Sequence, residues 1–134
     1  MPYEPVRNLG AGVTQAHERF NASVAAAAED GASGRVITIT VKEWETAVAQ
    51  VVPVRVWFAA TSKGAPSATD NAYGTLSAGL LVKEVTAHAD YEFLCSATGT
   101  IAFKLTVTGA VTRYINVVPA GATEISVSDA LTWA

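Results

Sequence analysis

Hydrophobic residues alternate with small or polar residues along most of the chain. The clearest case is the run IAFKLTV at 101–107, in which every second residue is large and apolar. In an extended chain this two-residue period places one apolar row on one face and one polar row on the other. The same period recurs in further runs, at 36–42, 54–58, 91–95, 115–117, 125–127 and 131–133. Turn residues separate these runs, so the pattern predicts successive antiparallel strands of a sandwich or barrel.

Residues 14–30 follow a different pattern. Ala16, Phe20, Val24 and Ala27 or Ala28 fall at helical spacing, and Gly31 is placed as a stop, which favours one short helix. The alternative is an extended segment, because the middle of the run contains Asn, Ser and Val, which are poor helix formers. We therefore expect an N-terminal arm and linker over 1–34 and a β-sandwich domain over 35–134.

The first thirteen residues are rich in Pro and Gly, which exclude regular structure. An arm of this kind is ordered only when something holds it, so we expect it to dock on a neighbouring chain. The candidate contact residues are Pro2, Tyr3, Pro5, Val6, Arg7 and Leu9. The arm has no apolar segment followed by a cleavage site, so it is not expected to act as a signal peptide.

Three aromatic residues fall outside the predicted apolar rows. By parity, Trp44 and Trp57 lie on the outward faces of their strands, and Tyr73 lies in a long polar loop over 59–79. Aromatic residues concentrate at protein contacts, so these three are candidate interface anchors. The alternative is a bulge that returns Trp44 to the core, or a sandwich edge that covers Trp57.

Composition agrees with one domain that neighbouring proteins cover in part. The chain has 134 residues, of which 50% are hydrophobic and 16% are charged, against about 25% charged in an average domain. The mean hydropathy is +0.27, which is high for a soluble monomer. We infer that subunits of the same or another chain cover some of this surface. The alternative is an Ala-rich sandwich that is monomeric.

The charge pattern argues against two classes of partner. The net charge is −3, and Lys and Arg are scattered singly, whereas nucleic-acid binding needs clustered cations. No run of eighteen apolar residues occurs, so no membrane span is expected.

No catalytic constellation is apparent in the sequence. His17 and His88 are isolated from each other and from other metal ligands, so neither a metal site nor another cofactor is expected. Cys95 falls in an apolar row, has no partner for an internal disulfide, and is interpreted as a core thiol. No nucleophile elbow or phosphate-binding loop is present. We therefore expect a protein that is not an enzyme.

From about residue 36 to the C-terminus the chain resembles an immunoglobulin-like β-sandwich of the bacterial type. The residues that carry this resemblance are VITITVKEWE, VVPVRVWFA and the segment from Ala89 to Val118. The first turn lacks the Asp-Gly-Asn run usual in that family. A more specific resemblance is to small virion proteins of tailed bacteriophages, carried by five short elements: Arg55-Val56-Trp57, Ala89 to Glu92, Thr98 to Phe103, Thr112 to Tyr114 and Ala130 to Trp133.

The phage resemblance implies a structural role. Proteins of this kind serve as capsid decoration or cement proteins, or as neck, tail and fibre components. It implies the major capsid protein or other virion subunits as partners, self-association into a homo-oligomer, and a location in the virion after assembly in the bacterial cytoplasm. Two alternatives of other classes remain open: an enzyme accessory domain, and a carbohydrate- or receptor-binding module in which Trp44, Trp57 and Tyr73 stack on sugar rings.

Overall fold

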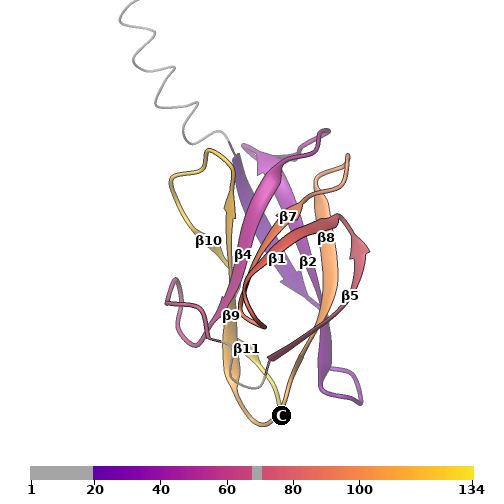
Figure 1. Ribbon diagram of the computed structural model, residues 1–134, viewed down its shortest axis with the longest axis vertical. Helices are drawn as coiled ribbons and strands as arrows, with labels where there is room; N and C mark the ends of the chain where they lie inside the picture. Colours follow the sequence, from indigo (N-terminus) through magenta and orange to yellow (C-terminus); the bar gives the residue numbers. More distant parts are fainter. Residues whose placement is uncertain (1–19, 68–70) are drawn as a thin grey trace, which may run out of the picture.

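Two antiparallel sheets pack face to face in the computed structural model, which describes residues 20–67 and 71–134 (Figure 1). The first sheet has the strand order β1-β2-β8-β5, with β3 also paired to β2. The second has the order β10-β9-β4-β7-β6, with β11 also paired to β9. The strands are β1 (Phe20–Ala26), β2 (Gly34–Glu43), β3 (Thr46–Ala47), β4 (Pro53–Ala59), β5 (Asn71–Ala78), β6 (Leu80–Thr86), β7 (Asp90–Leu94), β8 (Thr100–Val107), β9 (Thr112–Pro119), β10 (Ser126–Val127) and β11 (Leu131–Thr132).

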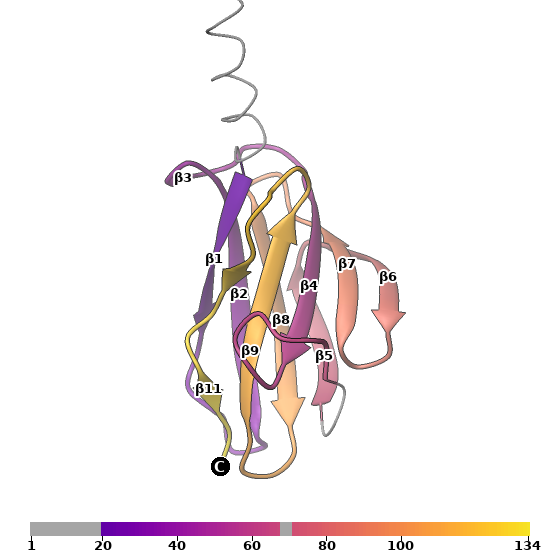
Figure 2. The same cartoon turned by 90° about the vertical axis from the view of Figure 1, so that its left-hand side faces the viewer.

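The strand order is that of an immunoglobulin-like sandwich, as the sequence predicts. Strands β1, β2, β8 and β5 take the places of A, B, E and D, and β10, β9 and β4 take those of G, F and C. Strands β7 and β6 extend the second sheet beyond β4, on the right in Figure 2. The chain reaches β6 directly from β5 through Gly79, whose φ is +88° and where a Cβ would lie 2.9 Å from the Leu94 carbonyl oxygen. Glycine is therefore required where the chain crosses between the sheets.

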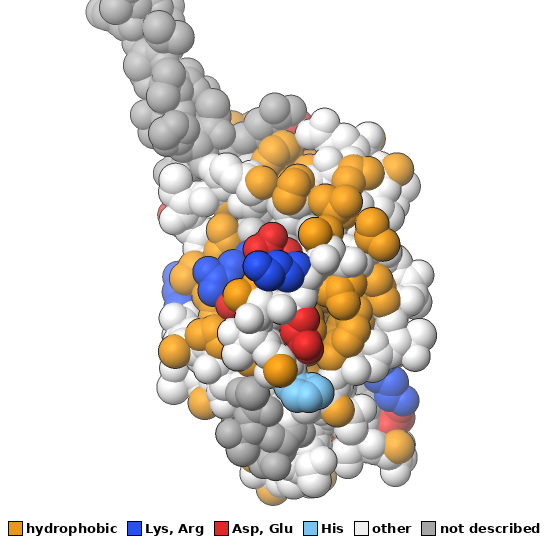
Figure 3. All heavy atoms as spheres, viewed as in Figure 1, with side chains coloured by type: hydrophobic (Ala, Val, Ile, Leu, Met, Phe, Trp, Pro, Cys, Tyr) orange, Lys and Arg blue, Asp and Glu red, His pale blue; other side chains and the backbone are white. Residues whose placement is uncertain are grey.

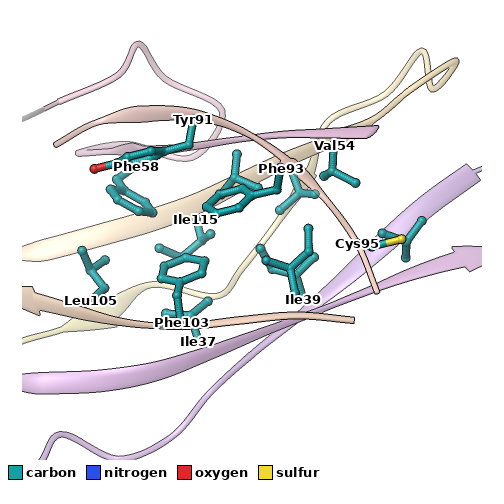
Figure 4. Close-up of a cluster of buried hydrophobic side chains, with 14 of the residues drawn as sticks. Ile37, Ile39, Val54, Phe58, Tyr91, Phe93, Cys95, Phe103, Leu105 and Ile115 are labelled. Atoms are coloured by element: carbon teal, nitrogen blue, oxygen red, sulfur yellow. The ribbon is translucent and has the colours of Figure 1, made fainter. Parts of the chain in front are cut away.

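The core lies between the sheets and consists of the predicted apolar rows. Phe58, Tyr91 and Phe93 of the second sheet point towards Phe103 and Ile37 of the first (Figure 4). Phe93 and Phe103 stack with ring centroids 5.7 Å apart. The Cys95 thiol is buried at one end of the core, as expected from its place in an apolar row. Burial of this continuous apolar layer is the main stabilising contribution to the fold.

The short helix favoured over 14–30 is wrong for the described part of that segment. Residues 20–26 form β1, which pairs with β2 from Phe20 opposite Glu43 to Ala26 opposite Ile37. Alternate residues of β1 are half-buried and pack against the core: Phe20, Ala22, Val24 and Ala26. The first sheet therefore includes residues 20–26, which precede the expected boundary at residue 35.

The long loop expected over 59–79 is wrong in its second half. Residues Asn71–Ala78 form β5, which pairs with β8 through two register shifts. These irregularities break the two-residue period, which is why the sequence pattern of this strand is not visible.

No helix in the described ranges has the length and apolar character needed to cross a membrane.

Candidate interaction surfaces

Trp57 is not an exposed anchor, so that interpretation is wrong. Its side chain lies on the outer face of the second sheet but is only 6% exposed. The Trp57 Nε1 donates a hydrogen bond to the Gly64 carbonyl oxygen (2.8 Å), and the Arg55 guanidinium lies 4.9 Å from the ring centroid. The loop after β4 and the Arg55 side chain therefore cover Trp57, which is the covered-edge alternative.

Arg55 is itself held in place by a carboxylate. Its Nε and one terminal nitrogen donate to the two oxygens of Asp90, at 3.1 and 2.6 Å. This bidentate pair raises the pKa of Arg55, so the guanidinium that covers Trp57 stays charged at every ordinary pH. The arrangement is a structural clamp on the outer face of the second sheet.

Tyr73 does not lie on an outward loop either. It belongs to β5 and packs against the core, with its ring centroid 4.9 Å from that of Tyr91 and 5.4 Å from that of Phe103. Burial raises the pKa of the Tyr73 phenol. Its role is packing between the sheets, so the interpretation of Tyr73 as an interface anchor is wrong.

Trp44 is the predicted anchor that the structure places at the surface. It is 56% exposed and is the first of two loop residues between β2 and β3. Its φ is 60°, a left-handed conformation. Its carbonyl oxygen accepts a hydrogen bond from the Asn21 side-chain nitrogen (3.1 Å), which ties the turn to β1.

Trp44 lines two hollows at the surface. One, of about 260 Å³, is lined by Trp44 with Phe20, Asn21, Thr123, Glu124, Ile125 and Ser126. The other, of about 480 Å³, is lined by Trp44 with Glu43, Thr46, Ala47, Val48, Ala49 and Gln50. Trp44 is the residue that the two hollows share.

Strand β6 forms a second exposed surface, which the sequence did not single out. Leu80, Val82 and Val85 are 59%, 56% and 43% exposed. They lie at the edge of the second sheet, and hydrophobic side chains gather on this face of the molecule beside a group of charged ones (Figure 3). Val82 also lines a largely apolar groove of about 440 Å³, together with Pro53, Val54, Arg55, Glu92, Phe93, Leu94 and residues 118–122.

Two register shifts in β6 explain why its exposure could not be predicted. The shifts fall between Leu81 and Lys83 and between Glu84 and Thr86, so Val82 and Val85 are the extra residues. Each bulge reverses the inward and outward alternation, so the apolar residues of this strand do not follow one face. The run LLVKEVTA predicts a strand but not its phase.

The remaining candidates are settled only in part. Pro2, Tyr3, Pro5, Val6, Arg7 and Leu9 lie outside the described residues, so docking of the N-terminal arm stays a prediction. Within residues 20–67 and 71–134, no group of three or more His, Cys, Asp or Glu side chains is arranged to hold a metal ion.

Comparisons with known proteins give no family. No protein-family model matches the chain, and no curated protein matches it. One similar solved structure is the GH20 exo-β-N-acetylglucosaminidase from Vibrio harveyi in complex with N-acetylglucosamine, at 10% identity and a TM-score of 0.38. The likeness covers 84% of this chain and 18% of that enzyme chain. A match this weak supports no argument about activity.

Proposed function

We propose that this chain is a structural protein of a tailed-phage virion, of the capsid decoration or cement type, which acts by binding neighbouring subunits. Strand β6 is the surface on which this binding role rests. The virion setting rests on the sequence elements that resemble phage proteins, including Arg55-Val56-Trp57 in β4 and Ala89 to Glu92 at the start of β7.

The exposed apolar edge of β6 is the observation that carries the proposal. Among the described residues β6 pairs with β7 alone, so the backbone groups on its other side are available to a further strand. Edge strands are usually protected against such pairing, and exposed apolar patches mark interaction sites. A partner strand would cover Leu80, Val82 and Val85 and extend the second sheet.

A second copy of the chain fits this edge. In an antiparallel pairing, the numbers of any two opposite residues add to the same sum. A two-fold pairing that sets Lys83 opposite Glu84 of the other copy therefore also sets Val82 opposite Val85. Each contact occurs twice, as in any two-fold interface. The charged pair and the two bulges oppose indiscriminate edge pairing, so the association would select this partner.

The test compares lysine substitutions on and off the strand. Val82→Lys with Val85→Lys should abolish self-association in light scattering and weaken co-sedimentation with particles of the phage that carries the gene. Val36 and Val51 are 46% and 54% exposed and lie outside β6, so Val36→Lys with Val51→Lys is the matched control. A monomeric wild-type chain, or equal losses in both variants, would refute the role of β6. Absence of the chain from purified particles would refute the virion setting.

A further inference from the structure

The conformation of Trp44 is costly for a bulky aromatic residue. It occupies the first position of a two-residue hairpin loop at a φ of 60°. Two-residue hairpin loops with a left-handed first position normally use Gly, Asn or Asp there. A side chain with a Cβ is strained in this region, and such strain clusters at functional sites.

The fold does not gain core packing from Trp44 in return. Trp57 and Trp133 are 6% and 0% exposed, whereas Trp44 is 56% exposed. The hydrogen bond from the Asn21 side chain reaches the Trp44 carbonyl, which any residue would supply. The indole side chain therefore contributes little packing in return for the strained backbone of Trp44. This indicates a role for the indole in binding.

The groups around Trp44 define the chemistry of a ligand. The two hollows offer the hydroxyls of Thr46, Thr123 and Ser126, side-chain amides, and the Glu124 carboxylate. No Lys or Arg lines either hollow among the described residues. The Glu124 carboxylate, with no Lys or Arg among the described lining residues, disfavours phosphate or other anions. Carboxylates, amides and hydroxyls accept or donate hydrogen bonds to a neutral ligand rich in hydroxyl groups.

We propose that Trp44 is the platform of a saccharide-binding site that takes a neutral pyranose. One face of a pyranose ring presents C–H groups, which pack on the flat indole, while its edge presents hydroxyls. Both hollows that Trp44 lines carry hydrogen-bonding groups for those hydroxyls. This site shares no residue with β6, so it goes beyond the assembly role proposed above.

Three variants test the site. Trp44→Gly removes the ring and relieves the strained φ, and Trp44→Phe keeps both a ring and the strain. His88→Gly is the matched control, because His88 has a φ of 61° in the β6–β7 turn and lies outside both hollows. Ligand probes are maltotriose, cellotriose and mannotriose in solution and an array of neutral glycans. Acrylamide quenching of tryptophan fluorescence reports Trp44, since the other two tryptophans are buried.

We expect at least one neutral glycan to bind and to protect the wild-type chain from quenching. Trp44→Gly should weaken that binding by roughly 5- to 150-fold, the range found when an aromatic platform for a planar ring is removed. Trp44→Phe should retain part of the affinity, and His88→Gly all of it. Both glycine variants should melt at or above the wild-type temperature.

Two results would overturn the site. One is an array on which no neutral glycan binds, and the other is glycan binding that Trp44→Gly leaves intact. Loss of self-association or particle binding in Trp44→Gly without any glycan binding would also overturn it, because Trp44 would then be a protein contact. None of these outcomes changes the result expected for the lysine variants of β6, so the two proposals can fail separately.

Discussion

Charge reversal at the centre of β6 is the sharpest test of pairing between two copies. In the proposed register Lys83 faces Glu84 of the second copy, and the two-fold axis repeats the contact. Lys83→Glu would set Glu opposite Glu at both places, and Glu84→Lys would set Lys opposite Lys. The double variant Lys83→Glu with Glu84→Lys restores opposite charges at both places.

The size of the effect follows from the two repeated contacts. A pair of opposite charges on neighbouring strands contributes about 0.2–1 kcal/mol, and like charges are unfavourable by a similar amount. Each contact therefore changes by about 0.4–2 kcal/mol, and two contacts change the free energy of association by about 1–4 kcal/mol. That is a weakening of roughly five-fold to a thousand-fold for either single variant.

Sedimentation velocity over a range of concentrations measures the association constant of each variant. Within one copy Lys83 also lies opposite Glu92 on β7, so a thermal melt is needed to separate weaker association from a less stable fold. The double variant should recover most of the wild-type association. Failure of the double variant to recover it, with an intact melt, would refute this register, and single variants that associate normally would refute the pairing.

Three further predictions concern stability. Trp133 is fully buried, so Trp133→Ala should cost about 3–5 kcal/mol in urea unfolding, whereas Trp133→Phe should cost less than half as much, because the indole N–H has no hydrogen-bond partner among the described residues. Gly79→Ala should cost at least about 1 kcal/mol, because Gly79 has a left-handed φ and a Cβ would meet a backbone oxygen. Hydrogen bonds from Lys104 and from two backbone N–H groups lower the pKa of Asp30 to about 2, below its value of 3.8 in an unfolded chain. The stability that Asp30 contributes is therefore complete above pH 4 and is lost as the pH falls towards 2, so the difference between wild type and Asp30→Asn should shrink across that window in acid unfolding followed by circular dichroism.

The sequence predicts strands well where one face is buried and the pairing is regular. Strand β8 pairs with β2 over seven consecutive positions, from Thr106 opposite Gly34 to Thr100 opposite Thr40, and its alternation is complete. Strands β5 and β6 each contain two register shifts, so their alternation is interrupted. Strand β1 is missed for another reason: Phe20 and Val24 fit helical spacing as well as the two-residue period, and the pairing with β2 favours the strand.

The candidate site is harder to predict because exposure depends on how loops and neighbouring side chains lie over the outward face of a strand. Trp44 and Trp57 have the same outward parity, yet a hydrogen bond to Gly64 and the Arg55 side chain cover Trp57. Arg55 lies two residues before Trp57 on the same face of β4, but the hydrogen bond from Trp57 to Gly64 in the following loop has no signature in the strand. The left-handed φ of Trp44 is equally invisible in sequence, because a two-residue loop that reads Trp-Glu gives no turn signal.

The two proposed surfaces lie on opposite sides of the molecule, which has a consequence for binding strength. The β2–β3 hairpin that carries Trp44 and the edge strand β6 are far apart in Figure 2. A dimer formed through β6 would therefore keep both Trp44 sites open, and two linked sites bind a densely coated surface more tightly than either site alone.

This consequence makes a prediction that joins the two proposals. On a dense layer of the glycan that binds, the wild-type chain should show an apparent affinity at least about tenfold above that of Lys83→Glu. In solution the two proteins should bind the free oligosaccharide equally well, as isothermal titration calorimetry can measure. An equal loss in solution would mean that the two surfaces are coupled. Equal binding to the dense layer would mean that a dimer cannot engage both sites at once.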